Sequence, residues 1–225
     1  MTDPGAEAPG GPAALQHPRF ARAYARAVEG MNRRGGTEHR RNLLSSLHSR
    51  VIEIGAGDGS AFALYPATVT EVLAVEPDDY LRALATEKAV SAPVPVTVAA
   101  GAAEAIPAAD ASADAVVTSL VLCSVVDQSA ALAEARRVLR PGGVLAFYEH
   151  VRSEHGVLAV AEDVLTPLWK QVAGGCHPNR DTLRAITEAG FTVSDNRRFG
   201  FSVHPLAPPV AHILGHATTP VLGTP

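Results

Sequence analysis

Short apolar runs, each bounded by polar or glycine-containing stretches, recur along this chain and predict buried strands. The seven runs are RVIEIG, EVLAVE, VPVTVAA, DAVVTSLVL, GGVLAFYEH, FTVSDNRRF and VAHILGHATT. Most of the stretches between them space their apolar residues three and four positions apart, which predicts helices. Examples are DDYLRALATEKAV, SAALAEARRVLR and NRDTLRAITEAG.

The order of these elements indicates the fold class. Five strand–helix alternations in succession predict a parallel sheet with helices on both faces. The last two runs follow a single helix, so we expect them to add an antiparallel edge strand. Two helical stretches, residues 19–35 and 37–48, predict an N-terminal helical cap, and a long helix is expected over residues 156–172. We therefore expect a Rossmann-like, doubly wound α/β fold with a seven-stranded, mostly parallel sheet.

Length and composition fit one folded unit with short ends. The 225 residues are enough for a single domain, and 47% hydrophobic with 19% charged residues is ordinary for a globular protein. Residues 1–18 are rich in Pro, Gly and Ala and predict a disordered tail. We expect the domain to span residues 19–217 and a C-terminal tail to span residues 218–225.

Composition disfavours several kinds of partner and cofactor. The formal net charge of -4 argues against nucleic acid. No signal peptide and no run of about 18 apolar residues is visible, so we expect a cytoplasmic protein without an integral membrane segment. Cys123 and Cys176 fit neither a disulfide framework nor a metal-ligand spacing, and no HExxH motif occurs, so no metal is expected. The oligomeric state is left open.

The first strand run leads directly into the glycine turn GAGDG, residues 55–59. Glycines allow a ligand to approach the backbone closely. The spacing differs from the GxGxxG of dinucleotide-binding folds, and the chain lacks the GK[ST] ending of a phosphate loop. In doubly wound sheets such a turn lies at the carboxyl ends of the strands, where ligands bind.

Two acidic residues indicate what this turn binds. Glu76 ends the second strand run about 20 residues further on, where a carboxylate accepts hydrogen bonds from ribose hydroxyls. Glu53, before the turn, is placed to receive a ligand's ammonium group, and the helix expected after Gly59 would favour its carboxylate. An adenosine with an amino-acid tail is S-adenosylmethionine. In the alternative, Glu76 and Pro77 only cap the next helix and Glu53 is a solvated strand end.

Four segments follow one another as successive motifs: EIGAGDG, AVEP, GAAEAIPAADASADAVVTSLVLCSV and EARRVLRPGGVLAFYEH. In this order they resemble class I S-adenosylmethionine-dependent methyltransferases, over roughly residues 38–217. The segments LVLCSV, RRVLRPGG, EHV, LTPLWKQVAGGC and AHILGHA resemble more closely the methyltransferase-like protein 7 family of thiol S-methyltransferases. Animal members of that family carry an N-terminal membrane anchor, which we do not expect here.

The resemblance implies which residues hold the cofactor. Carried over motif by motif, they are Glu53, Gly55, Ala56, Gly57, Gly59, Glu76, Pro77, Ala102, Ala103 and Leu120. The glycine turn would hold the methionine part and the adenosine, Glu76 the ribose, and the backbone of Ala102 and Ala103 the adenine edge. Leu120 would lie near the reacting sulfonium. Many members have Asp where this chain has Ala102, so a side-chain bond to adenine is missing here.

The acceptor side carries weaker signals, because methyl transfer from a sulfonium needs mainly alignment. The candidate catalytic residue is His150, after the fifth strand run, as a general base, with a hydrogen-bonded loop histidine as the alternative. Cys123 is expected to line the pocket rather than act as a nucleophile. For Cys176 we favour a loop with a helix N-cap at Asn179 over a catalytic pair with the adjacent His177.

The expected function is methyl transfer from S-adenosylmethionine to a small, fairly apolar acceptor, with a thiol as the first choice. Methylation of an oxygen or carbon of a phenolic or quinone-like metabolite is one alternative, and a non-catalytic cofactor-binding protein is another. A dehydrogenase is disfavoured by the glycine spacing. Tyr24 and Met31 are expected either to cover the cofactor or to pack on the sheet, and Leu165, Leu168 and Trp169 to lie in the core or in the acceptor pocket wall.

Overall fold

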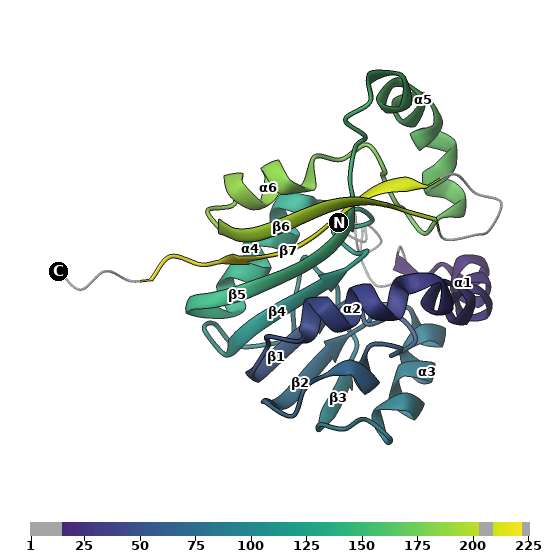
Figure 1. Cartoon of the computed structure of the whole chain (residues 1–225). Helices are drawn as coiled ribbons and strands as arrows, with labels where there is room; N and C mark the ends of the chain where they lie inside the picture. Colours follow the sequence, from purple (N-terminus) through teal and green to yellow (C-terminus); the bar gives the residue numbers. More distant parts are fainter. Residues whose placement is uncertain (1–14, 203–208, 222–225) are drawn as a thin grey trace, which may run out of the picture.

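The computed structural model describes residues 15–202 and 209–221, arranged around one seven-stranded sheet (Figure 1). The strand order is β3-β2-β1-β4-β5-β7-β6. The strands are β1 (Ser49–Ile54), β2 (Val69–Val75), β3 (Val96–Ala99), β4 (Ala113–Ser119), β5 (Leu139–His150), β6 (Thr192–Phe201) and β7 (Val210–Thr218). Each of them coincides with one of the seven apolar runs.

The strand directions confirm the predicted topology. The neighbours from β3 to β5 all pair in parallel, whereas β7 runs antiparallel to both β5 and β6. The antiparallel strand therefore lies between two others, and β6 forms the edge. The strand order reverses at β1 and β4. The carboxyl ends of these two strands thus form the switch point at which doubly wound sheets bind their ligands.

The helices begin where the sequence supplies a capping side chain or a proline. They are α1 (Pro18–Met31), α2 (Thr37–Leu44), α3 (Asp79–Ala89), α4 (Gln128–Val138), α5 (Gly156–Val172) and α6 (Thr182–Glu188). The carboxylates of Asp78, Asp127 and Asp181 accept hydrogen bonds from the first-turn N–H groups of α3, α4 and α6. The expected N-cap at Asn179 is therefore wrong, because Asp181 caps α6.

One local element agrees with the prediction and another differs from it. Between α1 and α2, Gly35 adopts a non-helical φ of 125°, so the chain kinks there and the first helical stretch ends at residue 35, as predicted. After Gly59, the expected helix is only a short 3-10 turn, Phe62–Leu64. A single turn of this kind offers no helix N-terminus, so the expectation that one would favour a ligand's carboxylate is wrong.

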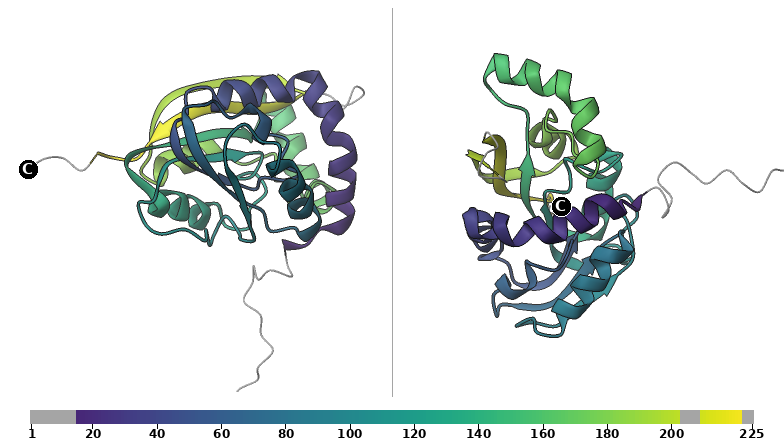
Figure 2. Two further views of the ribbon diagram at one scale, coloured as in Figure 1. Left: turned by 90° about the horizontal axis from the view of Figure 1, so that it is seen from below. Right: turned by 90° about the vertical axis from the view of Figure 1, so that its right-hand side faces the viewer.

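Apolar side chains form one core on each face of the sheet. On one face, Leu43, Leu44 and Phe62 pack against β1 and β2 together with residues of α3. On the other face, Leu132 of α4 and Ile186 of α6 pack against β4 and β5. The two views of Figure 2 show these helices on either side of the strands. Burial on both faces explains why the strand runs are continuously apolar rather than alternating.

Helix α5 stands away from the sheet (Figures 1 and 2). Its exposed large apolar side chains are Val157, Leu158, Val160, Val164, Leu165, Leu168, Trp169 and Val172. Placing Leu165, Leu168 and Trp169 in the core is therefore wrong, while their place in an acceptor pocket wall stays a prediction. Among the described residues, no helix combines the length and the apolar character needed to cross a membrane.

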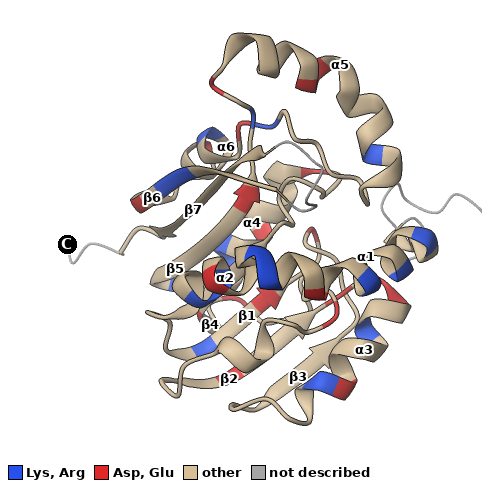
Figure 3. Ribbon diagram, turned by 45° about the vertical axis from the view of Figure 1, so that its right-hand side comes forward, with Lys and Arg blue, Asp and Glu red and all other residues tan. Residues whose placement is uncertain are grey.

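The charged side chains form no separate region of one sign on the helices nearest the viewer, and most of the expected tails lie outside the described residues. In the view of Figure 3, basic and acidic residues are interspersed over α1, α2 and α3. The N-terminal tail expected over residues 1–18 lies outside the described residues as far as residue 14, as do residues 222–225 of the expected C-terminal tail.

Candidate cofactor and acceptor site

The glycine turn after β1 adopts backbone angles that side chains disfavour. Gly55, Gly57 and Gly59 have φ values of 64°, 59° and 76°, in the left-handed region that favours glycine. A Cβ on Gly55 would lie 2.5 Å from a methyl group of Val121. The turn therefore needs glycine for its own shape as well as for the approach of a ligand.

Glu76, directly after β2, is tied to this turn. Its carboxylate accepts hydrogen bonds from the backbone N–H of Gly57 at 2.8 Å and of Asp78 at 3.0 Å. The residue is 5% exposed, and its burial raises the pKa of the carboxyl group to about 7. The two hydrogen bonds act in the opposite direction, because they stabilise the charged carboxylate. Each carboxylate oxygen has more than one acceptor position, so these bonds are compatible with further donors such as ribose hydroxyls.

Glu53 lies deeper in the same site, near the end of β1. It is 3% exposed and accepts a hydrogen bond from the Tyr65 hydroxyl at 2.9 Å. Burial raises its pKa to about 7, while the Tyr65 bond and the charge of Arg40 act in the opposite direction. The alternative of a solvated strand end is wrong, because this carboxyl group is buried.

Arg40 of α2 is a buried cation beside this site that the sequence analysis did not single out. Its guanidinium donates to Asn32 Oδ1 at 2.5 Å and to Ser119 Oγ at 3.4 Å, and it is 7% exposed. A signal was present, because Arg40 shares its helix face with the inward residues Leu43 and Leu44. Together, Glu53 and Arg40 offer a buried acid and a buried base, the complement of a zwitterionic amino-acid group.

The N-terminal segment covers the glycine turn. A Cβ on Gly57 would lie 3.3 Å from the ring of Tyr24 on α1. Just before α1, Gln16 donates to the Pro77 carbonyl at 2.8 Å and accepts from the backbone N–H of Asp79 at 3.1 Å. Of the two expectations for Tyr24, the structure places it over the turn, and the adjoining segment is held to the loop after β2.

The remaining predicted cofactor residues lie after neighbouring parallel strands. Ala102 and Ala103 follow β3, where the Ala102 carbonyl accepts a hydrogen bond from the backbone N–H of Ala105 at 3.1 Å. Leu120 follows β4 with a φ of 63°, and its N–H donates to the Tyr148 carbonyl at 2.7 Å. A leucine in the left-handed region is strained, and such strain concentrates at functional sites. All predicted cofactor residues therefore meet at one edge of the sheet.

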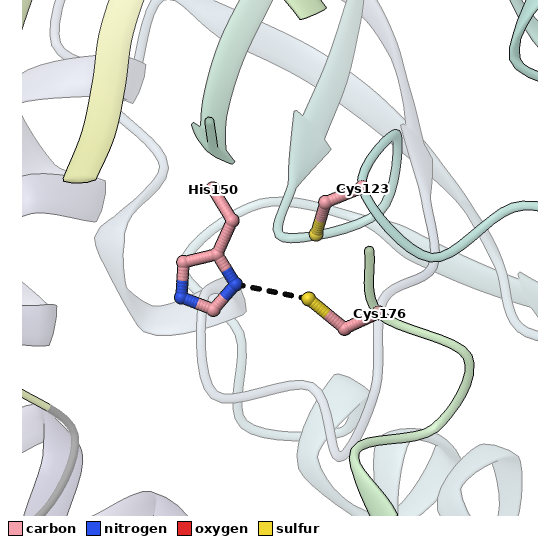
Figure 4. A group of neighbouring side chains, drawn as sticks. All are labelled: Cys123, His150 and Cys176. Carbon is pink, nitrogen blue, oxygen red and sulfur yellow. Dashed lines mark hydrogen bonds between the residues drawn. The ribbon is translucent and has the colours of Figure 1, made fainter. Parts of the chain in front are cut away.

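The acceptor-side candidate, His150, ends β5 at the same edge of the sheet. Its imidazole is 8% exposed, and its Nδ1 lies 3.1 Å from the Sγ of Cys176 (Figure 4). Its Nε2 is buried and has no hydrogen-bond partner among the described residues. The ring also packs on the His212 ring, with 4.2 Å between centroids.

Cys123 and Cys176 lie beside His150, although they are distant in sequence (Figure 4). The three side chains place ligand atoms within 4.8 Å of one another, and all three are buried. The pKa of Cys176 is lowered by a hydrogen bond from Cys123 and by His150, while that of Cys123 is raised. The pairing of Cys176 with a histidine was missed because only its neighbour His177 was considered.

Two charged residues hold the loops of this cluster in place. The buried carboxylate of Glu149 accepts hydrogen bonds from the backbone N–H of Val121 and of Cys123, each at 3.2 Å. Arg180 donates to the Leu122 carbonyl at 2.7 Å. Glu149 therefore positions the loop after β4, a role beyond ending the strand that the sequence did not reveal.

Comparison with known proteins finds a family match for most of the residues that form this edge of the sheet. Residues 52–147 match the family model described as a methyltransferase domain. This part of the chain is therefore similar to methyltransferase domains. The fold of the chain is also that of a solved S-adenosylmethionine-dependent methyltransferase of Thermotoga maritima, with a TM-score of 0.66 and 23% identity, covering 89% of this chain and 96% of that chain.

The curated relatives are named for methyl transfer to different acceptors. Thiol S-methyltransferase TMT1B of Rattus norvegicus is 36% identical over 146 residues, which are 63% of this chain and 59% of the relative. The ubiquinone/menaquinone biosynthesis C-methyltransferase UbiE of Caulobacter vibrioides is 37% identical over 105 residues, 46% of this chain and 42% of the relative. The chain thus spans less than two thirds of the length of either relative.

The residues at this edge of the sheet fit S-adenosylmethionine. A buried carboxyl group, Glu53, and a buried guanidinium cation, Arg40, whose charge acts on it, offer an acceptor and a donor for the two charged groups of an α-amino acid. Glu76 holds a carboxylate against the same turn, with acceptor positions left for further donors, and the glycines leave the backbone of the turn without side chains. The sequence-based choice of this cofactor therefore agrees with the donors and acceptors that the fold brings together.

Proposed function

We propose that this protein transfers the methyl group of S-adenosylmethionine to the sulfur of a small, apolar thiol. The observation that carries the cofactor part is the buried pair of Glu53 and Arg40 beside the glycine turn. The acceptor part is supported by the relatives named thiol S-methyltransferases and by the sulfur- and imidazole-lined face at His150.

Each part of the cofactor has a matching group in the chain. Glu53 would accept from the ammonium group, Arg40 would donate to the carboxylate, and Glu76 would accept from the ribose hydroxyls. The backbone of Ala102 and Ala103 would contact the adenine edge. Leu120 would lie near the sulfonium, at the strained end of β4.

The bound sulfonium supplies an already activated methyl group, so the chain contributes mainly alignment and exclusion of water. Tyr24 and the segment before α1 would close the site over the cofactor, since they already cover the glycine turn. Good alignment of two reactants is worth about 7–11 kcal/mol of the barrier. A thiol then needs only to lose its proton, for which His150 is the group predicted from sequence.

A second candidate function is methylation of a carbon or oxygen of a phenolic or quinone-like compound. The relatives named UbiE support it. The exposed apolar side chains of α5, which leads to the loop of Cys176, suit a bulky apolar acceptor as well as a thiol.

The test is to incubate the purified protein with methyl-labelled S-adenosylmethionine and with separate sets of small thiols, phenols, quinols and amines. Formation of S-adenosylhomocysteine is followed, with Glu76→Ala as the cofactor-site variant and Glu87→Ala, an exposed position on α3, as the matched control. We expect turnover with thiols that Glu76→Ala abolishes and Glu87→Ala leaves intact.

Other outcomes would contradict defined parts of the proposal. Turnover with phenols or quinols alone would replace the thiol by the second candidate. Binding of S-adenosylmethionine without turnover on any acceptor class would favour a non-catalytic protein. Thermal stabilisation by NAD but not by S-adenosylmethionine would contradict the cofactor itself.

A further inference from the structure

Three side chains from distant segments form a candidate metal centre at the acceptor edge of the sheet. Cys123 lies in the loop after β4, His150 ends β5, and Cys176 lies in the loop after α5. We propose that Cys123 Sγ, Cys176 Sγ and His150 Nδ1 bind a soft divalent cation of the zinc type. Two thiolates and one imidazole are the donor set that selects such ions.

The distances suit this interpretation. Tetrahedral coordination with zinc–sulfur bonds of about 2.3 Å and zinc–nitrogen bonds of about 2.0–2.1 Å places ligand atoms ~3.5–3.8 Å apart. The three ligand atoms lie within 4.8 Å of one another, and Nδ1 of His150 is 3.1 Å from Sγ of Cys176. Figure 4 shows this imidazole nitrogen and both sulfurs turned toward a common point. Small side-chain shifts would complete the site.

The charges of the cluster also favour a cation. Two thiolates buried side by side would repel each other, whereas a divalent cation with two thiolates and a neutral imidazole is electrically neutral. The metal site therefore needs no further counter-ion.

His212, whose ring packs on that of His150, carries its proton on Nδ1, and this supports a His150 ring that is protonated on Nε2 and free to bind metal through Nδ1. Binding through Nδ1 leaves a proton on Nε2 of His150, and metal-bound histidines usually donate that proton to a neighbour. Nδ1 of His212 lies 2.9 Å from the Val210 carbonyl, which can only accept, so this nitrogen carries the proton of the neutral ring. The other nitrogen of His212 is then an acceptor beside His150, and both Nε2 atoms are otherwise buried without partners in the described structure.

Three protein ligands leave one tetrahedral position open, as in catalytic zinc sites. Resting on the proposed function, we assign this position to the acceptor sulfur. The thiol loses its proton to solvent on binding, and the sulfur then attacks the methyl carbon. The bond from that carbon to the sulfonium breaks, and its electron pair stays on S-adenosylhomocysteine. The thioether product binds the ion weakly and leaves, with the oxidation state of the metal unchanged.

This assignment changes the role of His150. A bound cation lowers the pKa of a thiol ligand, so it takes over the deprotonation that the sequence analysis gave to an imidazole base. A disulfide between Cys123 and Cys176 would explain the proximity of the sulfurs, but it would give the imidazole no part in the cluster.

The test starts from the full chain, reduced and stripped of metal under anaerobic conditions. Zn²⁺ affinity is measured by competition with a chromophoric chelator, and Co²⁺ is added as a spectroscopic probe. We expect one equivalent of metal per chain and an intense sulfur-to-cobalt absorption band. Cys123→Ser and Cys176→Ser should each weaken Zn²⁺ binding at least about tenfold and diminish the band. The control His48→Gln, at an exposed position, should change neither.

Several results would overturn the metal site. They are Zn²⁺ binding no tighter than that of the Cys123→Ser/Cys176→Ser double variant, a cobalt spectrum without the sulfur band, or cysteines recovered only as a disulfide. The wild-type spectrum decides this even if a cysteine variant fails to fold. Retained S-adenosylmethionine affinity shows that a variant is folded.

The acceptor role has its own readout. Addition of an aryl thiol to the Co²⁺-loaded protein should strengthen the sulfur-to-cobalt band, and the double variant corrects for cobalt bound by free thiol. Metal binding without methyl transfer would support the site and overturn the proposed function. Full thiol turnover by metal-free protein would support the function and overturn the acceptor role of the metal.

Discussion

The carboxyl-terminal edge of the sheet has a cofactor side, around the glycine turn, and an acceptor side, around His150. The two sides are built from the chain in different ways. On the cofactor side, one short segment supplies Glu53 and the three glycines, and Glu76 follows at the end of the adjacent strand. On the acceptor side, Cys123, His150 and Cys176 come from three separate segments. The matched methyltransferase domain, residues 52–147, ends before the second and third of these.

Glu53, the three glycines and Glu76 all lie within the matched range, whereas Cys123 is the one acceptor-side residue of the three that does. The cofactor side depends on backbone geometry and two buried carboxyl groups, which a contiguous motif can specify. The acceptor side depends on side chains that meet only when β5, the loop after β4 and the loop after α5 come together. Substitutions on the two sides should therefore have separable effects on cofactor binding and on acceptor chemistry.

The largest effect is expected from Glu76→Ala. Loss of charge-assisted hydrogen bonds to two ribose hydroxyls, each worth about 1.5–3 kcal/mol, should weaken S-adenosylmethionine binding at least about 100-fold. Calorimetric titration measures this, with Glu87→Ala as the control. Cys176→Ser should bind the cofactor within about twofold of wild type. An equal loss of S-adenosylmethionine affinity in both variants would show that the cofactor side and the acceptor side do not act independently.

The next effect is the pH dependence of stability that the two buried carboxyl groups of the cofactor side contribute. The pKa values of Glu53 and Glu76 are raised from 4.5 to about 7 by burial, so the folded state holds their protons more tightly than the unfolded state. Their contribution to stability therefore falls as the pH rises from about 4.5, and the full cost is present above pH 7. Between about pH 5.5 and about pH 8 this amounts to about 2 kcal/mol per group.

Urea unfolding of the cofactor-free protein checks this at both pH values. Glu53→Gln and Glu76→Gln should gain stability over wild type at the higher pH and much less at the lower one. The comparison is made against wild type because His212, whose pKa burial lowers to about 3, has the opposite trend. A gain that is the same at both pH values would contradict the raised carboxyl pKa values.

A smaller effect, about tenfold, is expected from Arg40→Gln, because one charge-assisted interaction with the cofactor carboxylate is lost. S-adenosylmethionine should bind more weakly, whereas methylthioadenosine, which lacks the amino-acid tail, should bind as it does to wild type. Arg41→Gln, at the exposed neighbouring position, is the control. Equal weakening of both ligands would show that Arg40 only supports the fold.

The smallest effect concerns Leu120, where the two sides meet. Because its φ is 63°, glycine should be tolerated better than alanine by about 1 kcal/mol, the reverse of the usual order. Thermal unfolding of Leu120→Gly and Leu120→Ala measures the difference. If alanine were the more stable of the two, the left-handed conformation at this position would be wrong.

Much of the fold was predictable because local patterns and global topology agree. The seven apolar runs became the seven strands, and the alternation with helices fixed the parallel order from β1 to β5. The short helix expected after Gly59 is a single 3-10 turn, so it offers no helix N-terminus for a ligand's carboxylate. The interior position expected for Leu165, Leu168 and Trp169 failed, since an apolar helical period does not say whether a partner surface exists.

Within the site, the sequence by itself determined the glycine turn and its two acids, because backbone angles and strand ends follow from neighbouring residues. Only the tertiary structure decided that the charge of Arg40 acts on Glu53, and that Cys176 meets His150 rather than the adjacent His177. Such contacts depend on how helices and loops pack over the sheet. Residues far apart along the chain share a site through that packing, which no local pattern encodes.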